Sequence, residues 1–161
     1  MGAGDRCYGD EINKVLNSHV KKKGADYDYR FLRNNFIAYL YTLGQIDYNE
    51  MLEYVLGRYV PRELSDNDFQ RLRNKLYTLP NERNFDRQFI AVPNEISAKI
   101  LKLKYQVTEG VELITDSSIP NADNAIYASE NVEDGRHLVI RNVSDEAYRA
   151  FFNCDNGQAG E

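Results

Sequence analysis

The spacing of hydrophobic residues changes once along this 161-residue chain, near residue 85, and this change restricts the possible folds more than any other feature. Before it, apolar residues recur every three or four positions, which is the spacing of an amphipathic helix. After it, residues 100–107 alternate between apolar and polar side chains, as a half-buried strand does. This order predicts an α+β fold, in which N-terminal helices precede a small antiparallel sheet and a C-terminal helix.

Four helices are expected in the first half of the chain. Capping residues at their starts, and glycine or proline at their ends, set their bounds. The expected ranges are 10–22, 27–43, 48–57 and 65–79. The clearest signals are Gly24, Gly44, Asp47-x-x-Glu50, Pro61, Ser65-x-x-Asp68 and Pro80. The helix over 27–43 is apolar most of the way round, so we expect it in the core or at an oligomer interface.

Shorter elements are expected after residue 85. They are an apolar segment over 85–92, one helical turn at 93–95, strands over 100–107, 111–114, 125–129 and 137–143, and a helix over 145–152 capped by Ser144. Asp134-Gly135 is a favourable hairpin turn between the last two strands. These elements predict a helical part over 1–84, a small antiparallel-sheet part over 85–152 packed on it, and a flexible tail over 153–161.

Charge is distributed unevenly along the chain, whose net charge is −5. Residues 61–104 carry nine basic and six acidic residues, whereas residues 105–161 carry three basic and eleven acidic ones. Phosphate binding depends on Lys and Arg, so an acidic chain is a poor nonspecific binder of nucleic acid. If nucleic acid is bound, the contacts are expected within 61–104; otherwise this segment is a solvated surface of mixed sign.

No combination of residues predicts catalysis. The two histidines, His19 and His137, have no nucleophile motif nearby, and Cys7 and Cys154 match no metal or redox spacing. The acidic residues of the second half are scattered through expected loops rather than set at ligand spacing. We therefore expect no enzyme activity, no metal and no cofactor. No apolar run reaches the roughly 18 residues of a membrane helix, so we expect a cytoplasmic protein without a membrane partner.

Tyrosine is unusually frequent, with twelve in the chain and seven of them between residues 27 and 59. Its large ring and polar hydroxyl suit protein interfaces and partly wet cores, although tyrosines beside arginines also stack on bases. We expect a homo-oligomer formed through the helix over 27–43. The interface residues predicted on that helix are Leu32, Phe36, Tyr39 and Tyr41.

A longer pattern runs through the second half of the chain. It consists of Phe85-Asp86-x-x-Phe89, Tyr105-x-Val107-x-x-Gly110-Val111-x-Leu113, Ile126-Tyr127, and Leu138-Val139-Ile140-x-Asn142-Val143 before the last helix. Over residues 30–152 this resembles the C-terminal region of the bacterial 37-kDa-type nucleoid-associated protein family. The resemblance implies a helical part before a small domain that ends in two strands and a short helix, and it implies proximity to DNA. Family members are much longer, so this sequence resembles a short relative or an excised domain.

The sequence therefore predicts a nonenzymatic, nucleoid-associated module that binds or lies close to duplex DNA. Contacts would be made to phosphates and would weaken steeply with salt. The predicted nucleic-acid-binding residues are Arg71, Arg73, Lys75, Arg83, Arg87, Lys99, Lys102 and Lys104. The alternative is a small protein-interaction protein, such as a phage-encoded inhibitor, an immunity protein or a DNA mimic, for which the acidic C-terminal third and the tyrosines are suited.

Overall fold

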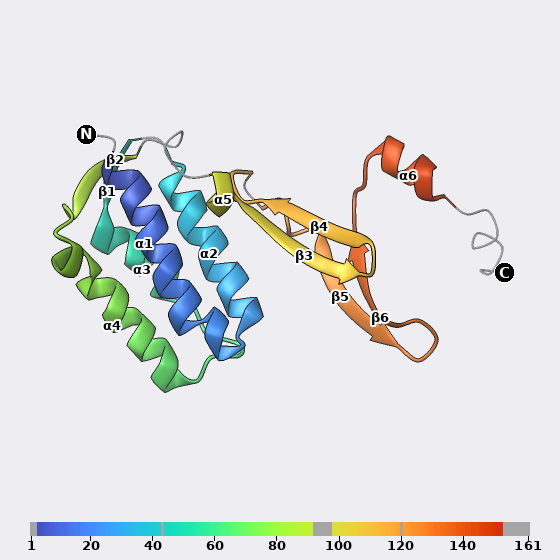
Figure 1. Ribbon diagram of the computed structural model, residues 1–161, viewed down its shortest axis with the longest axis horizontal. Coiled ribbons are helices and arrows are strands. Elements are labelled where there is room, and N and C mark those ends of the chain that lie inside the picture. Colours follow the sequence, from blue (N-terminus) through green and yellow to red (C-terminus); the bar gives the residue numbers. More distant parts are fainter. Residues whose placement is uncertain (1–2, 43, 92–97, 120, 153–161) are drawn as a thin grey trace. The chain divides into compact units, whose positions relative to one another are not determined.

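The computed structural model describes residues 3–42, 44–91, 98–119 and 121–152 (Figure 1). The chain forms two compact units, residues 1–120 and 121–161. The first contains α1 (Ala3–His19), the 3-10 helix η1 (Lys21–Lys23), α2 (Asp26–Leu40), β1 (Gly44–Asp47), α3 (Tyr48–Leu56), α4 (Asp66–Arg83), β2 (Gln88–Ala91), α5 (Ala98–Leu101), β3 (Lys102–Thr108) and β4 (Val111–Asp116). The second contains β5 (Ile126–Asn131), β6 (Gly135–Ile140) and α6 (Asp145–Phe151). The predicted α+β class is confirmed.

The core of the first unit lies among the helices. Helix α1 packs against both α2 and α4, and α3 packs against α2 and α4 as well. Apolar residues at helical spacing fill the space between them, as the sequence predicts. Residues that are almost completely buried there include Ile12, Leu16, Leu32, Phe36, Leu40, Met51, Leu52, Leu56, Leu72 and Leu76. Burying each of these side chains contributes about 1.5–3 kcal/mol.

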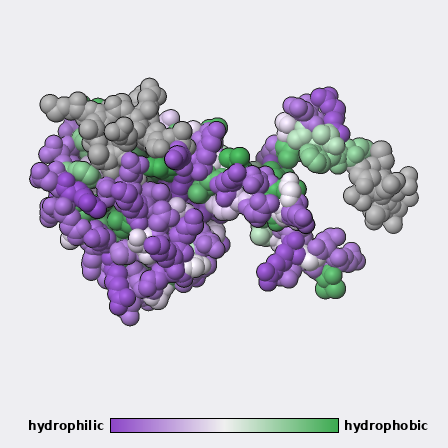
Figure 2. Space-filling model, in the orientation of Figure 1, coloured by the Kyte–Doolittle hydropathy of each residue, from purple (hydrophilic) through white to green (hydrophobic). Residues whose placement is uncertain are grey.

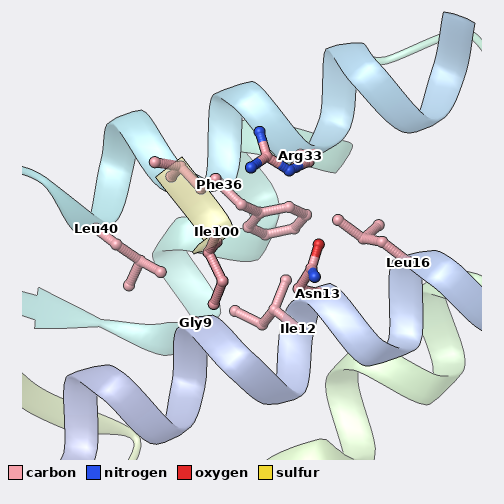
Figure 3. Close-up of a pocket in the computed structure, with 9 residues that line it drawn as sticks. Gly9, Ile12, Asn13, Leu16, Arg33, Phe36, Leu40 and Ile100 are labelled. Carbon is pink, nitrogen blue, oxygen red and sulfur yellow. The ribbon is translucent and has the colours of Figure 1, made fainter. Parts of the chain in front are cut away.

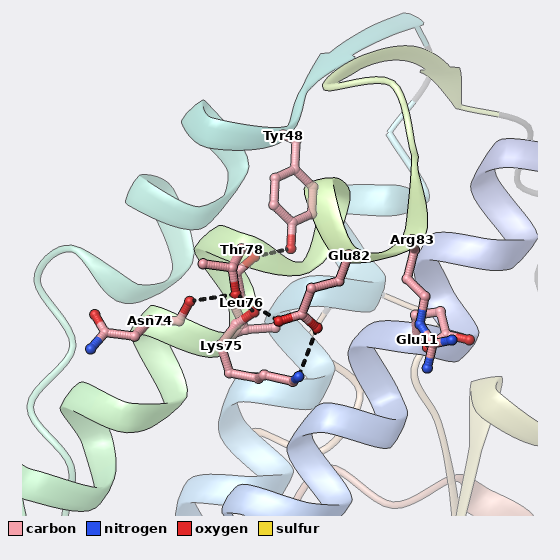
Figure 4. A network of polar contacts seen from close by, with 8 residues as sticks. All are labelled: Glu11, Tyr48, Asn74, Lys75, Leu76, Thr78, Glu82 and Arg83. Carbon is pink, nitrogen blue, oxygen red and sulfur yellow. Dashed lines mark hydrogen bonds and ion pairs between the residues drawn. The ribbon is translucent and has the colours of Figure 1, made fainter.

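Helix α4 extends beyond its predicted end. The sequence places the end at Leu79 because proline interrupts helices, but α4 continues through Pro80 to Arg83. Proline has no backbone N–H, so the carbonyl of Leu76 has no helical donor. The buried hydroxyl of Tyr48 donates to this carbonyl at 2.6 Å, which replaces the missing bond (Figure 4). Asn84, with a φ of 55°, then ends the helix in the left-handed conformation.

Strands β1 and β2 form a two-stranded antiparallel sheet that the sequence predicts only in part. The sequence predicts an apolar segment over residues 85–92. It predicts only a connection between two helices at Gln45 and Ile46. In the structure Ile46 is buried and pairs with Phe89. This pairing makes residues 88–91 part of the first unit, which continues to residue 120, beyond the boundary expected at residue 84.

The hairpin of β3 and β4 follows the predicted alternation except at Val107, which is exposed and lies at a shift of the strand register. Tyr105 pairs with Leu113 and Leu103 with Thr115 on the half-buried face, while Lys104 and its neighbours two residues away are exposed. The strand begins at Lys102 rather than at residue 100, because residues 98–101 form the single turn α5. Gly110, with a φ of 78°, makes the turn that returns the chain along β4.

The second unit consists of the hairpin β5–β6 followed by α6. The strands pair from Ile126 with Ile140 to Asn131 with Gly135, and Gly135 has a φ of 69° at the predicted turn. Strand β6 ends at Ile140, earlier than predicted, because Asn142 takes a left-handed conformation. Ser144 caps α6 as expected, its hydroxyl accepting from the N–H of Ala147. The helical turn expected at 93–95 and the tail expected at 153–161 lie outside the described residues.

Candidate functional site

The predicted nucleic-acid-binding residues all lie in the first unit but do not form one patch. Arg71, Arg73, Lys75 and Arg83 lie on α4, whereas Lys102 and Lys104 lie on β3. Figure 1 shows α4 and the β3–β4 hairpin on opposite sides of α1 and α2. A duplex bound along α4 would therefore not reach the lysines of β3 across the same face.

Most of these cations already contact acidic or polar groups of the chain. The ion pairs are Arg71 with Asp68 (3.5 Å), Lys75 with Glu82 (2.7 Å), Arg83 with Glu11 (3.2 Å) and Lys104 with Glu112 (3.0 Å). Figure 4 shows the pairs of Lys75 and Arg83 beside α4. Arg87 donates to the side chain of Asn49 at 2.7 Å, and Lys102 lies opposite Asp116 across the sheet. Nearby carboxylates reduce the positive potential available to phosphate.

The remaining two cations do not change this distribution. The guanidinium of Arg73 lies 5.9 Å from the centre of the Phe69 ring, on the same helix. Lys99 is exposed on the short turn α5. The structure therefore divides the eight predicted residues between two faces of the first unit.

The predicted oligomer interface on α2 is largely internal. Leu32 and Phe36 are buried in the core of their own chain, and Tyr39 and Tyr41 are half-buried against it. The helix is apolar most of the way round because it packs against both α1 and α3. Leu32 and Phe36 are thus not accessible to a second copy of the folded chain, and the expected homo-oligomer stays a prediction.

The tyrosines of the helical half serve mainly as core and packing residues. Tyr48 stacks on Tyr8, whose ring also stacks on Phe89, and burial raises the pKa of Tyr8 to about 12. Tyr27 is half-buried, with the guanidinium of Arg62 at 3.9 Å from its ring centre. Base stacking, the alternative role considered for these tyrosines, would require exposed rings. Among the seven tyrosines between residues 27 and 59, Tyr54 is the most exposed.

The cavity found inside the first unit is too small to hold a substrate or a cofactor. A cavity of about 10 Å³ lies between α1, α2 and α5 and holds at most one water molecule (Figure 3). Its lining is apolar except for Asn13 and Arg33. Within the described residues, no group of three potential metal ligands comes together. Burial, together with Lys75 and Lys23, lowers the pKa of His19, so neutral imidazole is favoured.

Asp28 is a fully buried carboxylate that the sequence did not single out. It accepts hydrogen bonds from the Tyr59 hydroxyl and from the N–H groups of Arg62, Glu63 and Leu64. Burial alone would raise the pKa of this carboxyl, but the four donors outweigh burial and lower it. Asp28 therefore fixes the connection between α3 and α4, which is a structural role.

Arg33 is a second buried charge without a signal in the sequence. It donates to the Ser117 hydroxyl at 2.7 Å and to the Asn34 side chain at 3.2 Å, and it forms no ion pair with any described carboxylate. Burial lowers its pKa, although an arginine remains charged. Because Ser117 follows β4, this bond ties the β3–β4 hairpin to α2, and the cavity that Arg33 lines has a volume of only about 10 Å³.

The second unit exposes a large amount of apolar surface. None of its described residues is buried, and Tyr148 and Phe151 of α6 are 57% and 87% exposed. We call the exposed apolar side chains of this unit the hairpin–helix surface; they are Tyr127, Val132, Leu138, Ile140, Val143, Tyr148, Phe151 and Phe152. Figure 2 shows apolar colour over α6 and at the tip of the β5–β6 hairpin.

The same unit carries the whole net charge of the chain. Residues 121–161 include eight acidic and three basic residues, whereas residues 1–120 include seventeen of each. Two of the basic residues are engaged locally, since Arg136 pairs with Glu130 at 3.8 Å and Arg141 lies over the ring of Tyr127. An apolar surface with an acidic border is therefore the most distinctive feature among the described residues.

Comparison with protein-family models, with curated proteins and with solved structures found no match for this chain. The resemblance to the nucleoid-associated family accordingly stays a prediction. Among the described residues, no helix combines the length and apolar character needed to cross a bilayer.

Proposed function

We propose that this protein is a nonenzymatic interaction module that binds a protein partner through the hairpin–helix surface. One observation carries the proposal: the described part of the second unit has no buried residue while exposing eight large apolar side chains. A two-stranded hairpin is at best marginally stable in water without a surface to pack on. Large amounts of exposed apolar surface are typical of regions that bind other proteins.

The distribution of charge favours a protein partner over duplex DNA. Four of the eight residues predicted to contact phosphate lie within 3.5 Å of a carboxylate of the same chain. At low salt, phosphate can replace the carboxylates that pair with these exposed cations. The acidic second unit nevertheless favours a basic partner over DNA, which is acidic. The proposal thus corresponds to the small protein-interaction protein among the alternatives raised by the sequence.

The test is an affinity capture with matched variants. The full chain, Ile140→Lys and Ile90→Lys would each be immobilised through the N terminus and incubated with lysate of the source organism. Ile140 and Ile90 both lie on strands of two-stranded sheets and are 48% and 70% exposed, so the two changes are chemically alike. Only Ile140 belongs to the hairpin–helix surface.

We expect one protein in stoichiometric amount on the wild-type chain and on Ile90→Lys, and its loss on Ile140→Lys. Capture that is insensitive to Ile140→Lys would overturn the proposal. A gel shift with duplex DNA at low and moderate salt runs in parallel. A salt-sensitive shift that Arg71→Ala weakens, together with no captured protein, would favour the DNA-binding alternative instead.

A further inference from the structure

The outer edge of β6 has backbone groups available for another strand. Arg141 donates to the carbonyl of Ala125 at 2.9 Å, and hydrogen bonds in an antiparallel pair join opposite residues at every second position. The next bonded pairs are therefore those of Val139 and His137, and the N–H and C=O groups of Leu138 and Ile140 point away from β5. Among the described residues, no strand pairs with this edge.

The side chains beside this edge are apolar and exposed. Leu138 and Ile140 lie on one face of the hairpin, because alternate residues of a strand share a face. They are 42% and 48% exposed. The outer edge of β5 is less suited, since the corresponding residues are Ile126, the small Ala128 and the charged Glu130. Backbone and side chains together thus make β6 the better edge.

Acidic residues lie at both ends of this edge. Glu133 and Asp134 are in the turn that precedes β6, and Asp145 and Glu146 are in the first turn of α6, a few residues after the strand ends. All four side chains are exposed. An extended segment lying along β6 would therefore meet Leu138 and Ile140 in the middle and these carboxylates beyond either end of the strand. Arg136 and Arg141 lie closer to the strand ends, where Arg136 pairs with Glu130 and Arg141 lies over the Tyr127 ring.

We propose, on the basis of the proposed function, that β6 binds an extended segment of the partner protein as an added strand. The segment has alternating apolar residues at its centre and Lys or Arg at both ends. Main-chain hydrogen bonds supply affinity in this mode of recognition, and side chains supply specificity. A second copy of the chain fits less well, because two antiparallel β6 strands would bring the acidic ends of both copies together.

The probe is a fluorescein-labelled peptide, Lys-Val-Ser-Val-Ser-Val-Ser-Lys, titrated with the full chain and followed by fluorescence anisotropy. Two further peptides carry N-methyl groups, one on the valine nitrogens and the other on the internal serine nitrogens. Each blocks the donors of one strand edge while keeping every side chain, so strand pairing requires that one methylated peptide binds and the other does not. A fourth peptide replaces both lysines by glutamate.

We expect binding of the parent peptide and of one methylated peptide, weakened by salt, with affinity about tenfold lower for Ile140→Lys and unchanged for Ile90→Lys. Circular dichroism would verify that both variants keep the fold. Equal binding of both methylated peptides, or of the glutamate peptide, would overturn strand addition. Absence of peptide binding would also overturn strand addition. If capture of a partner were still lost with Ile140→Lys, the proposed function would stand. Sedimentation showing a dimer that Ile140→Lys dissociates would assign the edge to a second copy.

Discussion

Asp28 shows how one buried carboxylate organises a connection that has little regular structure. Both of its oxygens accept hydrogen bonds, one from the Tyr59 hydroxyl and the Arg62 N–H, the other from the N–H groups of Glu63 and Leu64. A carboxylate has acceptors only, so it matches four donors. An amide of the same shape would place its own N–H groups against some of these donors.

We therefore expect Asp28→Asn to lower the free energy of unfolding by about 3 kcal/mol. The matched control is Asp26→Asn, an exposed acidic residue in the same first turn of α2, which should cost less than about 1 kcal/mol. Urea unfolding followed by circular dichroism measures both. Equal losses for the two variants would contradict the role assigned to Asp28.

The same carboxyl predicts a dependence of stability on pH. Its pKa is lower in the folded chain than the ordinary value of 3.8, so the folded state binds this proton less readily than the unfolded state does. The stabilisation is complete above the ordinary pKa and is lost as pH falls through the lowered folded pKa. The free energy of unfolding should fall less between pH values of about 6 and 3 in Asp28→Asn than in the wild-type chain.

The sequence alone did not reveal Asp28 or Arg33. Both are charged residues on a predicted helix, where a single sequence indicates exposure. Apart from Asn34 beside Arg33, their hydrogen-bond partners are 31 to 84 residues away. The eight cations of the predicted nucleic-acid site were read from composition, and ion pairs such as that of Arg83 with Glu11 depend on the packing of α4 on α1. Contacts between distant segments have no local signal.

Local signals performed better at the scale of the elements. Asp47, Ser65 and Ser144 were each predicted to cap a helix, and each side chain accepts from the N–H three residues later. The alternation over 100–107 was confirmed as strand β3, apart from its first two residues. Strand β1 was missed because its partner strand is distant in the sequence. Gln45 of β1 and Gln88 of β2 are 43 residues apart.

Tyr48 and Pro80 should be energetically coupled. Tyr48→Phe keeps the ring but removes the donor to the Leu76 carbonyl, which should cost about 1–2 kcal/mol. Pro80→Ala restores the helical N–H to that carbonyl, so Tyr48→Phe should cost less in a chain that already carries Pro80→Ala. A double-mutant cycle from urea unfolding measures the difference. Additive losses would show that the two residues act independently.

At the scale of the whole molecule, the two units should differ in local stability. The first has a packed core, whereas the described part of the second has none. Hydrogen exchange of the full chain, without a partner, should therefore show the slowest amides in α1 and α2 and much faster exchange in β5 and β6. Equal protection of the two units would contradict this. If the proposed function holds, a bound partner should slow exchange in β6.

The pairing of β1 with β2 has a consequence for how the chain folds during translation. Asp47 and Gln88 are opposite residues separated by 41 positions, with α3 and α4 between them. At about 5–20 residues per second, β2 follows β1 from the ribosome with a delay of roughly two to eight seconds. During this delay β1 has no partner strand. The helices that emerge before β2 therefore assemble without the β1–β2 sheet, which forms only after β2 has left the ribosome.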